Sequence, residues 1–169
     1  MKNQNSPYSI SLRTVPVLLL LSVLLLSLTA IASAASWSGI EPLKSTRADV
    51  EKILGKPIGE PGPNGELRFK VAGGTVDIYF TGAHFVEVKK LHPKFEGTVL
   101  EIVLKHESSS DTPESLDLTK KKDFEHEHKA NVDVYRNLGE GISYTFIDGK
   151  LRTTRYAAST EQLSKARKG

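Results

Sequence analysis

Two segments of alternating apolar and polar residues, separated by a pair of glycines, limit this chain to a narrow range of folds. Apolar side chains recur at every second position in residues 67–71 and again in residues 76–80, and Gly73 and Gly74 lie between the segments. A period of two is typical of a β-strand with one buried face, and two such segments joined by glycines predict a β-hairpin. We therefore expect an antiparallel sheet.

Further strands are predicted along the chain. Asp148-Gly149 separates the last two of them and predicts a two-residue type I′ hairpin turn. The crowded apolar residues of the first indicate a central strand covered on both faces. These predicted strands are residues 98–106, 132–134, 142–146 and 151–156.

One helix is predicted, over about residues 47–54. Thr46 and Asp49 have the spacing of a capping box, Val50 begins an apolar helical face, and Gly55 marks the end. We expect an α+β fold in which this helix packs on an antiparallel sheet of about five to six strands. Two half-units of similar plan, joined near residue 110, are the alternative arrangement.

Two long segments lack a regular pattern. Residues 82–96 carry many apolar side chains for a loop, which predicts either a packed segment or an interaction surface. Residues 107–115 are polar, and we expect a flexible connector there. The tail from Ser159 is expected to form one or two helical turns.

Residues 1–35 have the features of a secretory signal peptide. Lys2 and Arg13 supply positive charge, residues 15–32 are almost entirely apolar, and the segment contains no acidic residue. Small side chains follow, which predicts cleavage after Ala34 or Ala35.

Cleavage would release residues 36–169 as a single domain in the periplasm or outside the cell. The alternative is an uncleaved N-terminal membrane anchor, because a spanning helix needs about 20 apolar residues and the leader lies at the lower edge of that range. The sequence contains no cysteine, so we expect neither a lipid anchor nor a disulfide.

The leader also accounts for most of the net charge. The whole chain has 23 basic and 20 acidic residues, and 21 basic residues remain without Lys2 and Arg13. Charges of both signs are mixed along the rest of the chain, which argues against a nucleic-acid partner. After cleavage we expect no membrane partner either.

Residues 42–57, with the sequence Pro-Leu-Lys-Ser-Thr-Arg-Ala-Asp-Val-Glu-Lys-Ile-Leu-Gly-Lys-Pro, resemble a group of small exported bacterial proteins of uncharacterised function. Residues 141–144 and 155–156 are similar to the C-terminal hairpin of that group. More distantly, the helix resembles that of the outer-membrane assembly lipoproteins and the β-lactamase-inhibitor-protein-like fold. This resemblance implies helices packed on an antiparallel sheet.

His126 and His128 are the best candidate metal ligands, because in an extended strand both imidazoles project from the same face. A zinc site needs three or four ligands, so we predict a solvated charged stretch and no metal or cofactor. Nucleophile motifs such as Gly-x-Ser-x-Gly are absent from the sequence.

These observations predict a non-enzymatic binding or accessory protein of the cell envelope or extracellular space, whose partner is another envelope or secreted protein. The candidate binding residues are Phe85, Val88, Leu91 and Phe95. The alternative is a hydrolase of envelope polymers that uses carboxylates or the His126/His128 pair. A third possibility, an inhibitor of a secreted enzyme, rests only on the distant resemblance of fold.

Overall fold

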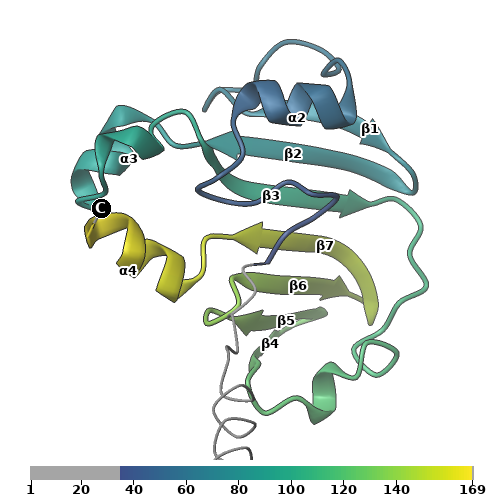
Figure 1. The fold of residues 1–169 in the computed structure, drawn as a ribbon. Coiled ribbons are helices and arrows are strands. Elements are labelled where there is room, and N and C mark those ends of the chain that lie inside the picture. Colours follow the sequence, from purple (N-terminus) through teal and green to yellow (C-terminus); the bar gives the residue numbers. More distant parts are fainter. Residues whose placement is uncertain (1–34, 169) are drawn as a thin grey trace, which may run out of the picture. The chain divides into compact units, whose positions relative to one another are not determined.

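The structure, a computed structural model, describes residues 35–168. Residues 1–34, which hold all of the predicted signal peptide except Ala35, lie outside the described residues. The described residues form an α+β fold in which helices pack against one antiparallel sheet (Figure 1). None of these helices is long and apolar enough to span a bilayer.

The sheet within residues 35–168 has seven strands in the order β1-β2-β3-β7-β6-β5-β4. The predicted fold class is thus confirmed, but the sheet has seven strands where about five to six were predicted. The sheet consists of two meanders, β1 to β3 and β4 to β7, that meet where β3 pairs with β7. The strands are β1 (Leu67–Val71), β2 (Gly74–Phe80), β3 (Val99–His106), β4 (Glu125–Lys129), β5 (Val132–Asn137), β6 (Ile142–Ile147) and β7 (Lys150–Ala157).

The additional strand is β4, for which the sequence predicted no strand. Its residues, Glu-His-Glu-His-Lys, are all exposed, so no apolar alternation marks it as a strand. Its position depends on β5, because His126 lies opposite Tyr135 and the two rings stack with their centroids 4.3 Å apart. Charged side chains are typical of sheet edges that avoid pairing with other chains.

The predicted helix is confirmed as α2 (Arg47–Leu54). The Thr46 hydroxyl accepts a hydrogen bond from the Asp49 amide, and the Asp49 carboxylate accepts one from the Thr46 amide, so the expected capping box forms. Val50 is fully buried against the sheet. Gly55 follows at φ 82° and ψ −148°, a backbone region that favours glycine.

One face of the sheet, here called the core face, carries the apolar clusters. In the first meander, α2 and the segment before it cover a cluster that includes Phe69 and Ile102. In the second meander, residues 116–124 cover a cluster around Phe146. The strand residues of both clusters occupy every second position in register with one another, so their side chains all point to the core face.

The expected connector, residues 107–115, leads from β3 to the cover of the second meander. The Leu151 amide donates a hydrogen bond to the Asp111 carbonyl at 2.9 Å, and Pro113 is buried. Thr112 and Ser115 exchange side-chain to backbone hydrogen bonds. Hydrogen bonds therefore attach this segment to the second meander.

Two short helices, α3 (Ala83–Val88) and α4 (Thr160–Lys168), lie side by side at one end of the sheet (Figure 1). The Ser159 hydroxyl accepts a hydrogen bond from the Gln162 amide and caps α4. The helices form because they cover one another: the buried cluster between them consists of Leu43, Val86, Leu91 and Ala166. The sequence predicted a loop where α3 lies and only one or two helical turns where the nine-residue α4 lies.

Candidate functional site

The face of the sheet opposite the core face, here called the open face, holds two arginines on either side of one serine. Arg136 of β5 and Arg155 of β7 each lie directly opposite Ser143 of β6 in the strand register. Directly opposed residues have Cβ atoms about 4.5–5.5 Å apart. Both guanidinium groups therefore extend from positions adjacent to the Ser143 hydroxyl.

A β-bulge in β7 brings Arg155 to this position. Counted from the turn at 148–149, an uninterrupted hairpin would place Thr154 opposite Ser143 and Arg155 on the core face. The register instead shifts by one residue beside Phe146. The bulge therefore turns Arg155 toward the open face. Bulges commonly redirect a side chain of the strand that carries them.

Each arginine is held by one glutamate. Arg155 Nη1 lies 3.0 Å from Glu101 Oε1, and Arg136 Nη2 lies 2.8 Å from Glu127 Oε2. The two arginine side chains remain 49% and 42% exposed, respectively. A guanidinium has five N–H donors in a fixed geometry, so each arginine also has donors that point away from its glutamate.

A cleft of about 370 Å³ adjoins the two arginines at the end of the open face. Its polar lining is Glu101, Arg136, Ser143, Arg155 and Thr160, and its apolar lining comes mainly from Leu138, Ala157, Ala158 and Leu163. We call this site the arginine cleft. Its volume falls at the lower end of the range of about 300–1,000 Å³ that is usual for small-molecule sites, and its composition of apolar walls with a few polar groups is also usual there.

The apolar side of the arginine cleft includes an exposed leucine in a fixed turn. Leu138, in the turn between β5 and β6, is 62% exposed, the highest value among the large apolar side chains of the described residues. The amide and hydroxyl of Thr160 both donate hydrogen bonds to its carbonyl, at 3.2 and 3.1 Å. The first turn of α4 thus fixes the backbone that carries this exposed side chain.

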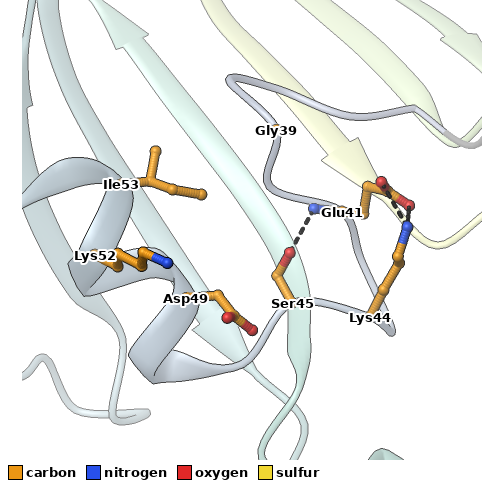
Figure 2. A pocket seen from close by; sticks show the side chains of 7 residues that line it. All are labelled: Gly39, Glu41, Lys44, Ser45, Asp49, Lys52 and Ile53. Atoms are coloured by element: carbon orange, nitrogen blue, oxygen red, sulfur yellow. Dashed lines mark hydrogen bonds and ion pairs between the residues drawn. The ribbon is translucent and has the colours of Figure 1, made fainter.

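A second depression, of about 470 Å³, lies between α2 and the segment before it (Figure 2). Most of its polar groups already serve the local structure. Lys44 pairs with Glu41 at 3.0 Å, Ser45 Oγ accepts a hydrogen bond from the Glu41 amide, and Asp49 belongs to the capping box of α2. We therefore regard the arginine cleft as the better candidate for ligand binding.

The four binding residues that the sequence predicted lie elsewhere, around α3. Leu91 is 6% exposed, and Phe85 and Phe95 are half-buried against the cluster beneath α4. The Phe95 carbonyl accepts hydrogen bonds from the hydroxyls of Thr81 and Thr98, which fixes this segment to the sheet. Of the four, only Val88, at 60%, presents most of its surface to solvent.

The two histidines of β4 share one carboxylate. His126 Nε2 and His128 Nδ1 lie 2.8 and 2.9 Å from the same oxygen of Asp133. Hydrogen bonds from both histidines lower the pKa of Asp133. No group of three or more His, Cys, Asp or Glu residues suited to hold a metal ion occurs within residues 35–168.

Comparisons of the chain with protein-family models, with curated proteins and with solved structures found no match. The function must therefore be argued from the arrangement of the residues. Arg136, Ser143 and Arg155 come from three different strands, so their proximity depends on the register of β5, β6 and β7 and on the bulge. The sequence alone offered no local motif for this site.

Proposed function

We propose that the chain is an exported binding protein of the cell envelope or extracellular space, and that its ligand occupies the arginine cleft. The observation that carries this proposal is the exposed Leu138 beside Arg136 and Arg155, whose side chains are 42% and 49% exposed. An exposed apolar side chain beside oriented polar groups is the usual composition of a binding site. Binding to this cleft requires no catalytic chemistry.

The leader supports the export part of the proposal. Its charged start, apolar segment and small-residue exit are those of a cleaved signal. Trp37 and Ile40 pack into the first core cluster, so cleavage after Ala34 or Ala35 would leave every residue of that cluster in the exported protein. Mass spectrometry of the exported protein should give an N-terminus at Ala35 or Ser36, whereas an intact Met1 would support the anchor.

The binding part can be tested with a neutral apolar dye, N-phenylnaphthylamine, whose fluorescence rises when it leaves water. Protein purified from cells that express the full chain should bind the dye, and Leu138→Ser should weaken binding by about threefold or more because it removes apolar contact area. The matched control is Val88→Ser, since Val88 is 60% exposed, close to the 62% of Leu138, and lies on α3.

The two variants separate the two candidate surfaces. Loss of dye binding in Leu138→Ser with normal binding in Val88→Ser would support the arginine cleft. The reverse pattern would place the binding surface on residues 82–96, as the sequence predicted. If neither variant affected dye binding, the cleft would not be the apolar site of this protein.

A further inference from the structure

We infer that the arginine cleft recognises a carboxylate attached to a short apolar group, with the carboxylate between Arg136 and Arg155 and the apolar group on Leu138 and Leu163. This inference rests on the proposed function, which concerns binding in the cleft, and adds the chemical class of the ligand. Its basis is the placement of two arginine residues on either side of Ser143, next to an apolar wall.

The geometry of the two arginines in the polar lining favours a carboxylate. A guanidinium donates parallel N–H groups that match the two oxygens of a carboxylate, and it stays charged at every physiological pH. Here Arg136 and Arg155 start on opposite sides of Ser143 and both line the cleft, and each pairs with a glutamate of the next strand outward. An anion above the serine would be bound by the donors that each guanidinium has beyond those facing its glutamate.

The charges of the two arginines and their glutamates favour a ligand with a single negative charge. Glu101 and Glu127 lie 3.0 and 2.8 Å from the two arginines, so each cation is partly neutralised already. A doubly charged phosphate would meet about twice the repulsion from the two glutamates that a singly charged carboxylate meets, because the Coulomb energy is proportional to the charge of the ligand. The cleft is therefore better suited to a monoanion.

The apolar wall accounts for the rest of the ligand. Leu138, Ala157, Ala158 and Leu163 line the cleft directly beside the arginines. A volume of about 370 Å³ has room for a short aliphatic chain or for one apolar amino-acid side chain. A medium-chain fatty acid and the C-terminal residue of a peptide share this chemistry, and the experiment below distinguishes the two sources.

The experiment compares acids with their neutral counterparts by NMR, with protein purified from cells that express the full chain. The two pairs are octanoate against octanol, and acetyl-Ala-Leu with a free carboxylate against its C-terminal amide. We expect the backbone amide signals of Leu138, Ser143 and Arg155 to shift, and at least one acid to bind about tenfold more tightly than its neutral partner. The acid that binds more tightly identifies the source of the carboxylate.

Three single variants test the role of the arginines. Arg136→Gln and Arg155→Gln should each weaken binding of the acid by about tenfold and leave binding of the neutral partner nearly unchanged. Arg47→Gln is the matched control, because Arg47 also forms an exposed ion pair, with Glu51 at 2.8 Å, but lies outside the cleft. Its binding should equal that of the unaltered protein.

The possible results separate this inference from the proposed function. If acids and neutral partners bound the cleft equally, the cleft would remain a binding site but the carboxylate inference would be wrong. If none of the four compounds shifted the cleft signals while N-phenylnaphthylamine bound, the carboxylate inference would also be wrong. If neither the compounds nor the dye bound there, both proposals would be overturned.

Discussion

The buried carboxylate of Asp77 accepts two hydrogen bonds from the guanidinium of Arg68, at 2.6 and 3.0 Å, across the first hairpin of the sheet. Lys105 on β3 lies 2.7 Å from the same carboxylate, whose side chain is only 1% exposed. Burial raises the pKa of Asp77, but hydrogen bonds and charges from Arg68 and Lys105 outweigh it and hold the pKa below the ordinary value of 3.8.

Replacing this carboxylate should destabilise the protein. We expect Asp77→Asn to lower the free energy of unfolding by about 1–2 kcal/mol near neutral pH, because two half-exposed cations lose a shared acceptor. The ion pairs stabilise the fold above pH 3.8, and this contribution is lost as the pH falls through the lower pKa of the folded state. Urea denaturation over a pH series measures both effects; a difference between the two proteins that stayed constant at acid pH would contradict this account.

His106 should make the stability depend on pH in a higher range. Its Nε2 lies 2.9 Å from Thr154 Oγ1, and burial lowers its pKa below 6.5 although Asp111 acts in the opposite direction. As the pH falls below about 6.5, His106 takes up a proton in the unfolded chain before it does so in the folded protein. The free energy of unfolding should therefore decrease from that pH downward.

The pKa of His106 can be measured directly by NMR titration of its ring protons. We expect a midpoint below 6.5, and we expect His106→Gln to remove the decrease in stability that the protonation of His106 causes. A midpoint above 6.5, or an unchanged pH dependence of stability in the variant, would show that burial does not control the pKa of His106.

Gly74 should tolerate no side chain. A Cβ at this position would lie 1.9 Å from the Lys105 carbonyl oxygen, which belongs to the neighbouring strand. We expect Gly74→Ala to lower the free energy of unfolding by about 2 kcal/mol or more. Gly82→Ala is the control, since a Cβ there would meet no atom within 4 Å; equal losses in thermal denaturation would exclude the contact as the cause.

Gly55 is restricted by its backbone alone. A Cβ there would meet no atom within 4 Å, yet φ is 82° and ψ is −148°. Gly55→Val should therefore cost about 1–3 kcal/mol through backbone strain at the end of α2. Chemical denaturation checks this value, and an unchanged midpoint would mean that the chain ends the helix equally well at negative φ.

Local signals predicted the parts of the fold that depend on neighbouring residues. The capping box, Gly55 and the hairpin around Gly73 all have the expected geometry, and Asp148 and Gly149 adopt the two positive φ values of a type I′ turn. β4 could not be predicted in the same way, because its exposed residues carry no alternation and its position depends on Tyr135 of the next strand.

The candidate site was harder to predict than the fold. A hairpin counted from its turn would place Thr154 opposite Ser143, and only the bulge brings Arg155 there. Nothing in the residue types of β7 marks the position of that bulge. The apolar wall depends on α4, whose packing partners Val86 and Leu91 precede it by about 70 residues in the sequence.

The joint between the two meanders also has a consequence for how the chain folds. Five of the six strand pairings join strands that follow one another along the chain. The sixth, between β3 and β7, joins strands far apart in the sequence and brings Glu101 beside Ala157 and Lys105 beside Thr153 (Figure 1). Closing so long an intervening loop is entropically unfavourable until the contacts form. We therefore expect each meander to assemble early, and the docking of one on the other to set the folding rate.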